Sequence, residues 1–249
     1  MPLHTQIAMQ LRQLKLSGMT PQIEVRLMEA QQNKLAYSEF LSMLLGDEIE
    51  HRAFRKMTLS LAKAGLGVEQ TMESFDFTFN PSINATHIRE LATCNFMHSG
   101  DGIFFLGPTG TGKTHLAKAI AHAACRHTYS VAYYTFHRLL ADLTSADLHN
   151  RLDALLKRLV TVDLLVIDDF ALKAFDQISA EFLYSIIDGR YAKRSIIITS
   201  NRSITDWGPL FPDPVMANAI LDRLAHRSHQ IIIKGESYRK KFAPAFAGA

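Results

Sequence analysis

The sequence predicts an α/β fold, in which a parallel sheet flanked by helices follows a small helical domain. From about residue 82, short apolar runs typical of buried strands alternate with longer segments of helical periodicity. This alternation favours a parallel sheet covered on both faces. Before about residue 64, apolar residues recur only at helical spacing. A glycine-rich loop directly follows the first apolar run, and such loops join a strand to a helix.

The first 64 residues carry the pattern of three helices. The first helix reaches about Leu16. Thr20 as N-cap and Pro21 in the first turn are expected to begin the second, which ends near residue 33. The third starts at Ser38. Its expected apolar face consists of Phe40, Leu41, Leu44, Leu45, Ile49, Phe54, Met57 and Leu61.

The rest of the chain is interpreted as a linker, an α/β domain and a tail. We assign residues 1–64 to the helical domain, 65–81 to the linker, 82–241 to the α/β domain and 242–249 to the tail. The five expected strands are 103–106, 130–134, 164–167, 195–199 and 230–233. The expected helices of this domain are 82–97, 113–127, 136–144, 147–160, 179–192 and 214–226.

Composition indicates a cytoplasmic protein without membrane association. Hydrophobic residues make up 47% of the chain and charged residues 20%, which is ordinary for a globular protein in water. No stretch approaches the roughly 18 apolar residues of a membrane-spanning helix. The first 16 residues carry Arg12 and Lys15 among helically spaced apolar residues, unlike a signal peptide. The two cysteines, Cys94 and Cys125, suit a reducing compartment.

The net charge of +3 is unevenly distributed. Residues 190–241 contain ten Lys or Arg against four Asp or Glu, a local charge of +6. A basic region of this kind indicates a nucleic-acid surface or a subunit interface. A solvated basic face without a partner is the alternative.

Residues 107–114 read GPTGTGKT and match the phosphate-binding loop G-x-x-x-x-G-K-[ST]. The glycines allow consecutive backbone N–H groups to turn toward an anion, and the following helix directs its positive end at the same place. Lys113 is expected to reach the β- and γ-phosphates, and the Thr114 hydroxyl to bind Mg²⁺. The predicted nucleotide-binding residues are Gly107, Pro108, Thr109, Gly110, Thr111, Gly112, Lys113, Thr114 and His115.

Two carboxylates, Asp168 and Asp169, end the apolar run that begins at Leu164. Burying both without partners would be costly, so we expect them at the carboxyl edge of the sheet beside a cation. This is the pattern of a Walker B element, in which Asp168 holds Mg²⁺ and Asp169 orients or deprotonates the attacking water. Related enzymes commonly carry glutamate at the second position. Asp169 is one methylene shorter, which predicts either a closer attacking water or slow turnover.

Two further side chains complete the predicted catalytic set. Asn201 follows the fourth expected strand, where its amide is expected to contact the γ-phosphate and the attacking water; capping of a turn is the alternative. Arg223 precedes the last strand and is expected to meet the charge that develops during phosphoryl transfer, in some enzymes from a neighbouring subunit. A surface or DNA-contacting arginine is the alternative for Arg223.

The sequences GPTGTGKTH, LLVIDDF, ITSN and AILDRLAHRSH together resemble the AAA+ ATPases of the IstB/DnaC group. The turn LKLSGM at residues 14–19 and the segment GESYR at residues 235–239 most resemble the IstB transposition helper proteins of bacterial insertion sequences. The resemblance covers nearly the whole chain. The Walker motifs occur in P-loop ATPases generally, and their order and flanking residues narrow the resemblance to this group.

The resemblance implies an AAA+ core with sheet order 5-1-4-3-2, ATP as ligand, and ATP-dependent self-association on duplex DNA. It also implies a cognate transposase as partner, which the ATPase helps direct to target DNA. With Mg²⁺ as cofactor, we expect hydrolysis of ATP to ADP and phosphate, stimulated by DNA or partner. About 16 residues follow the last expected strand, too few for the C-terminal helical lid of the wider superfamily, a truncation shared by the IstB and DnaC groups.

Two other functions remain open from the sequence. A helicase loader of the DnaC type would have the same core and a replicative helicase as partner. A small-molecule kinase would need a lid and an acceptor pocket, which the sequence does not indicate.

Overall fold

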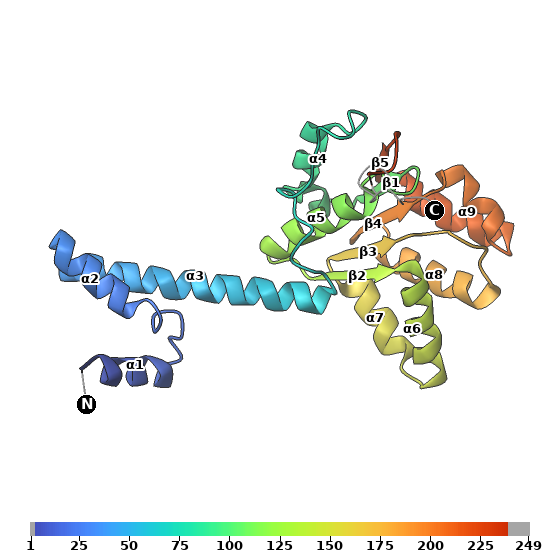
Figure 1. Ribbon diagram of the computed structural model, residues 1–249. Coiled ribbons are helices and arrows are strands. Elements are labelled where there is room, and N and C mark those ends of the chain that lie inside the picture. Colours follow the sequence, from blue (N-terminus) through green and yellow to red (C-terminus); the bar gives the residue numbers. More distant parts are fainter. Residues whose placement is uncertain (1–2, 239–249) are drawn as a thin grey trace, which may run out of the picture. The chain divides into compact units, whose positions relative to one another are not determined.

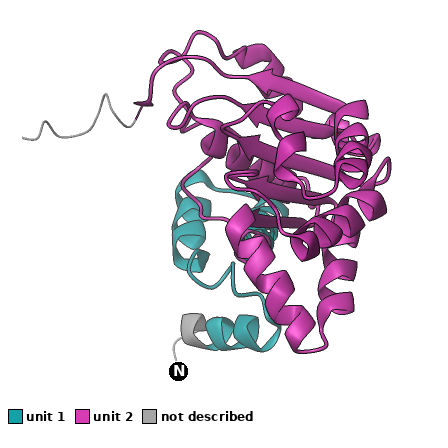
Figure 2. Cartoon of the chain, turned by 90° about the vertical axis from the view of Figure 1, so that its right-hand side faces the viewer, with its two compact units in different colours: residues 1–59 teal, residues 60–249 magenta. Residues whose placement is uncertain are grey.

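The computed structural model describes residues 3–238. The chain divides into two compact units, residues 1–59 and 60–249 (Figure 2). The predicted tail, 242–249, and the basic residues at positions 239–241 lie outside the described residues. Within the described part of the chain, no helix is long and apolar enough to cross a membrane.

The first unit is built from α1 (Leu3–Gln13), α2 (Ile23–Asn33) and most of α3 (Tyr37–Ala64). Its small core forms around Met19, Ile23 and Leu44. The turn between α1 and α2 is held by α3, because Glu48 accepts a hydrogen bond of 2.7 Å from the backbone N–H of Gly18. The last turn of α3, from Ser60, belongs to the second unit.

The structure corrects the expected start of the second helix. Thr20 is not an N-cap, because α2 begins at Ile23 after Gln22, which forms no side-chain cap. The Thr20 hydroxyl donates instead to the carbonyl of Leu16 at 3.4 Å, so Thr20 and Pro21 belong to the preceding turn.

The expected apolar face of α3 is distributed over two sides of the helix. Leu44 and Leu61 are buried, whereas Leu41, Leu45 and Ile49 are 46–68% exposed. A 28-residue helix has more apolar side chains than the two short helices α1 and α2 can cover.

The second unit contains a five-stranded parallel sheet in the order β2-β3-β4-β1-β5 (Figure 1). Read from the other edge, this order is 5-1-4-3-2. The strand order implied by the sequence resemblance is therefore confirmed. The strands are β1 (Gly102–Leu106), β2 (Val131–Thr135), β3 (Leu164–Asp168), β4 (Ser195–Ser200) and β5 (Ser228–Ile232). The three central strands, β3, β4 and β1, consist entirely of buried residues.

Helices cover both faces of this sheet, as the strand sequences predict. α5 (Lys113–Arg126) packs against β1, β3 and β4 on one face. On the other face, alternate strand residues such as Phe104, Leu165 and Ile198 join one large core cluster with residues of four helices. These helices are α6 (Phe136–Leu148), α7 (Leu152–Thr161), α8 (Gln177–Arg190) and α9 (Pro214–His226).

Several elements differ from the sequence prediction. The helix expected at 136–144 extends to Leu148, and the helix expected at 147–160 begins only at Leu152. The single helix expected at 82–97 is α4 (Ala85–Leu91) followed by a short 3₁₀ helix, η1 (Asn95–His98). The break falls at Cys94, whose φ of 63° is left-handed, a conformation that an α-helix does not accommodate. β5 begins two residues before the predicted start, because its pairing with β1 starts at Ser228 opposite Gly102. Two more 3₁₀ turns, η2 (Ile204–Asp206) and η3 (Gly208–Leu210), connect β4 to α9.

Candidate nucleotide site

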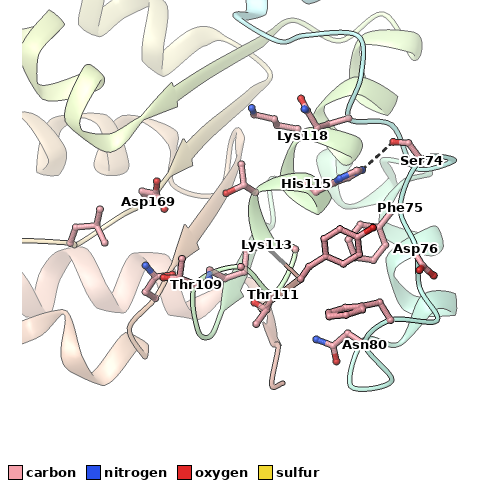
Figure 3. Close-up of a pocket in the computed structure, with 18 residues that line it drawn as sticks. Ser74, Phe75, Asp76, Asn80, Thr109, Thr111, Lys113, His115, Lys118 and Asp169 are labelled. Carbon is pink, nitrogen blue, oxygen red and sulfur yellow. Dashed lines mark hydrogen bonds between the residues drawn. The ribbon is translucent and has the colours of Figure 1, made fainter. Parts of the chain in front are cut away.

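A cavity of about 570 Å³ lies at the carboxyl ends of the central strands. Parallel sheets bind ligands at this edge, where the strand order reverses. The loop after β1 contributes residues 109–115, the turn after β3 contributes Asp169, and the end of β4 contributes Asn201 (Figure 3). Three of the predicted site segments, far apart in sequence, thus meet at one cavity.

The loop after β1 needs glycine where the backbone is left-handed and crowded. Gly107 has a φ of 143°, and a Cβ there would lie 2.0 Å from the carbonyl oxygen of Ile233. Gly110 has a φ of 83°, and a Cβ would lie 2.1 Å from the Ser237 hydroxyl. An alanine at either position would therefore clash and be strained. The glycine spacing recognised in the sequence is a requirement of this backbone.

The N-terminus of α5 faces the cavity without a side-chain cap. Asn84, Thr135, Asp176 and Asp213 cap α4, α6, α8 and α9 with their side chains. The residue before α5 is Gly112, which forms no such bond. The first N–H groups of a helix have no partner within the helix, and together with the helix dipole they attract anions. This end of α5 is suited to a phosphate group.

Lys113 lies against the loop from which it projects. Its side chain is almost fully buried, and Nζ donates to the carbonyl oxygens of Gly107 and Pro108, both at 2.7 Å. Gly107 and Pro108 thus form the base of the loop, while the next seven predicted residues line the cavity. The arrangement places a positive charge beside the uncapped N–H groups of α5.

The two predicted Mg²⁺ ligands meet in the structure. The Thr114 hydroxyl donates to Oδ1 of Asp168 at 2.9 Å. Asp168 ends β3 and is 2% exposed. Its Oδ1 also accepts from the Thr199 hydroxyl of β4, and its Oδ2 accepts from the Tyr133 hydroxyl of β2 at 2.6 Å. Hydroxyl and carboxylate oxygens are the ligands that Mg²⁺ prefers, so this pair fits the metal expected from the sequence.

Tyr133 keeps its proton in this environment. Burial, together with the hydrogen bond to Asp168 and the charges of Asp168 and Asp169, raises the pKa of Tyr133 well above its ordinary value. The phenol therefore acts as a hydrogen-bond donor to the carboxylate at physiological pH.

Asp169 and Asn201, the two residues that the sequence predicts to contact the attacking water, follow directly on β3 and β4. Asp169 has a left-handed φ of 56°, which aspartate tolerates better than most residues. Its backbone N–H donates to the Thr199 hydroxyl at 3.0 Å, so β4 fixes the turn that presents the Asp169 side chain. Asn201 directly follows β4, the strand that lies between β1 and β3 in the sheet. Both side chains line the cavity (Figure 3).

Comparison with known proteins assigns the family. The family model described as "IstB-like ATP binding protein" matches residues 9–244. This chain belongs to that family. The IstB-like chain is 40% identical over 231 residues to a protein of insertion sequence IS21 from Pseudomonas aeruginosa, named for ATP binding, covering 93% of this chain and 87% of that protein. It is 37% identical to an insertion-sequence protein of Mycobacterium tuberculosis, also named for ATP binding, covering 94% of each chain.

Solved structures agree with the AAA+ fold. The IstB-like chain is similar to the DnaC helicase loader, with a TM-score of 0.59 and 22% identity over 67% of this chain and 98% of that chain. It is equally similar to the replication initiator DnaA bound to AMPPCP and single-stranded DNA, with a TM-score of 0.59 and 21% identity over 70% of this chain and 53% of that chain. At these identities the similarity concerns the fold alone.

The supposed linker contributes a wall of the cavity that the motifs did not reveal. Phe75, Phe79 and Asn80 line the cavity, together with Tyr238 from beyond β5 (Figure 3). The Asn80 amide donates to the carbonyl of Lys234 at 2.8 Å, and the rings of Phe79 and Tyr238 meet edge to face at 4.8 Å. The sequence signal was present: three phenylalanines in five residues, at 75–79, are unusual for a solvated linker.

His115 joins this wall to the phosphate loop. Its Nε2 lies 3.2 Å from the Ser74 hydroxyl and 3.1 Å from the carbonyl of Thr71, and its ring meets Phe75 edge to face at 5.1 Å. His115, one of the predicted nucleotide-binding residues, therefore also holds the segment at residues 71–75 against the phosphate loop.

Arg223 is the predicted site residue that the structure places away from the cavity. Its guanidinium pairs with Asp188 at 3.0 Å and lies over the ring of Tyr184 at 5.4 Å. Its side chain is 26% exposed. Arg223 does not appear among the described residues that line the cavity, so the structure does not bring it together with Asp169 and Asn201.

Proposed function

We propose that this IstB-like protein is a slow, Mg²⁺-dependent ATPase that assembles on duplex DNA and assists the transposase of an insertion sequence. The observation that carries the ATPase part is the contact between Thr114 and Asp168, beside a lysine-bearing loop at the carboxyl edge of the sheet. The names of the insertion-sequence relatives support the transposition part. The similarity to the DnaC helicase loader does not favour a helicase-loading function, because the replication initiator DnaA matches the fold equally well.

In this proposal the phosphate loop, the Thr114–Asp168 pair and the side chains of Asp169 and Asn201 have defined tasks. The loop N–H groups, the α5 N-terminus and Lys113 bind the phosphates of ATP. Thr114 and Asp168 would hold Mg²⁺, which supplies positive charge beside the β- and γ-phosphates. Asp169 orients the attacking water and accepts its proton, and the Asn201 amide fixes the position of that water.

Substitution of Asp169 by asparagine is expected to stop hydrolysis and spare ATP binding. Asparagine keeps the shape and tolerates the left-handed backbone, but it cannot accept the proton, so kcat should fall about 10²- to 10⁴-fold. Phosphate release measures kcat, and titration with a fluorescent ATP analogue measures affinity. Asp153→Asn on the exposed surface of α7 is the matched control. Normal turnover in Asp169→Asn would assign the base to another residue.

The basic third of the chain offers fewer free charges than its composition indicates. Arg190 is 2% exposed and donates to backbone carbonyls, among them those of Leu159 and Val162, so it supports the fold and cannot contact DNA. Arg194 and Arg227 form ion pairs with Asp163 and Asp101. Within residues 190–238 of this region, a single subunit therefore contributes few phosphate contacts, and we expect firm DNA binding to require several subunits in a row.

We expect DNA affinity to depend on ATP and to fall steeply with salt. Each neutralised phosphate releases counterions, and about 6–10 contacts lower affinity roughly 10³- to 10⁵-fold between 50 and 200 mM salt. Fluorescence anisotropy with two unrelated duplexes, with and without a slowly hydrolysed ATP analogue, measures both effects. Equal affinity without nucleotide, or affinity unaffected by salt, would contradict the assembly on DNA.

A further inference from the structure

The carboxylate of Asp168 accepts hydrogen bonds from three hydroxyl groups on three different elements. Thr114 of α5 and Thr199 of β4 share Oδ1, and Tyr133 of β2 is the hydroxyl donor to Oδ2. The first two lie on segments already identified from the loop and from the end of β4. Tyr133 belongs to no motif, and it lies in a strand that the sequence presents as ordinary.

The register of the sheet explains how Tyr133 reaches the carboxylate. β2 pairs with β3 so that Tyr133 is opposite Val166 and Thr135 is opposite Asp168. Tyr133 and Asp168 therefore lie on the same face of the sheet, two residues apart in register on neighbouring strands, a diagonal that the long tyrosine side chain spans. A shorter side chain at position 133 would not reach Oδ2.

The ring of Tyr133 is itself held in position. The Lys118 ammonium lies over the ring face, 4.9 Å from its centroid. Lys118 follows Thr114 by four residues on α5, so both side chains are on the same face of that helix. Lys118 also lines the cavity (Figure 3). Tyr133 thus connects the cavity wall at Lys118 to the carboxylate at Asp168.

We propose that Tyr133 is a positioning residue for the metal site: its hydroxyl fixes the Asp168 carboxylate so that Oδ1 is presented beside the Thr114 hydroxyl. The inference rests on the proposed function, in which Thr114 and Asp168 hold Mg²⁺. Without the donor to Oδ2, only the two threonine hydroxyls on Oδ1 hold the carboxylate, whose terminal torsion has broad preferences, so its orientation is less narrowly fixed. Groups that orient a metal ligand in this way commonly change metal affinity by about 10- to 100-fold.

The test compares Tyr133→Phe with wild type in the binding of a fluorescent ATP analogue at increasing Mg²⁺ and in EDTA. We expect the Mg²⁺ concentration for half-maximal effect to rise about tenfold, with affinity in EDTA unchanged. Tyr134→Phe is the matched control, because that neighbouring tyrosine packs against the main core cluster. In an Asp168→Asn background, Tyr133→Phe should have no further effect, as a double-mutant cycle requires for coupled groups.

The outcomes separate this inference from the proposed function. A wild-type midpoint retained in Tyr133→Phe would overturn the inference while leaving the proposed ATP site intact. An equal loss of affinity in EDTA and in Mg²⁺ would show a general packing role and would also overturn it. If wild-type binding does not respond to Mg²⁺ at all, the proposed metal site itself fails. Mn²⁺ titration followed by electron paramagnetic resonance with ATP provides a readout that does not depend on turnover.

Discussion

Lys113→Met is expected to lower ATP affinity by about a hundredfold or more. Methionine keeps most of the unbranched stem and removes only the ammonium, whose Nζ lies 2.7 Å from the carbonyls of Gly107 and Pro108. Loss of a buried, charge-assisted contact to phosphate costs on the order of 3 kcal/mol, which corresponds to roughly a hundredfold in Kd. Titration with a fluorescent ATP analogue measures the loss directly.

The control for Lys113→Met is Lys157→Ala, an exposed lysine of α7 that is not among the described cavity residues. It removes the same charge from the same unit and should leave ATP affinity within about twofold of wild type. Thermal unfolding of both variants shows whether the fold is kept. Wild-type ATP affinity in a folded Lys113→Met protein would mean that the loop after β1 is not the ATP site.

Much of the candidate site could be predicted because its residues lie in short contiguous segments of the sequence. The phosphate loop needs glycine at fixed intervals before Lys113, and the carboxylates follow directly on a buried strand. These are local constraints, visible in eight or ten residues. The strands were equally clear, because central parallel strands are continuous apolar runs.

The missed parts depend on contacts between residues far apart in sequence. Asn80 belongs to the cavity wall through a bond to Lys234, 154 residues away. Tyr133 contacts Asp168 only through the register of β2 on β3. Such pairings are set by the packing of the whole sheet, and no short stretch of the sequence indicates them. The error at 82–97 has a different, local origin, because helical spacing does not reveal the left-handed residue Cys94 that divides the segment.

Arg223 differs from the other predicted site residues, because we propose that it acts on the ATP bound to a neighbouring subunit. The residue is held by Asp188 on the same subunit and stacks on Tyr184 and Tyr191. These contacts hold the guanidinium between α9 and α8 and leave the side chain about a quarter exposed. A pre-ordered arginine loses little further side-chain freedom when it meets a phosphate of a neighbour.

Arg223→Ala is expected to abolish ATP-dependent assembly on DNA and to lower DNA-stimulated ATPase activity about 10³-fold or more, because an arginine supplied between subunits contributes 10³ to 10⁵ in kcat. ATP affinity of the isolated subunit should remain within about twofold, since Arg223 is not among the described cavity residues. Arg227→Ala, four residues on and paired with Asp101, is the matched control. Loss of assembly in that variant alone would assign the role to Arg227.

Mixing Arg223→Ala with Lys113→Met protein distinguishes action between subunits from a local effect. An interface is complete when an Arg223→Ala subunit supplies the ATP site and a Lys113→Met subunit supplies the arginine. Only one of the four possible pairings in an equal mixture is complete, so complete interfaces form in isolated pairs and do not extend into a row. Only a small part of the DNA-stimulated ATPase activity should therefore return. An arginine that acts only within its own subunit, or that only stabilises α9 through Asp188, would give no activity above that of the separate variants.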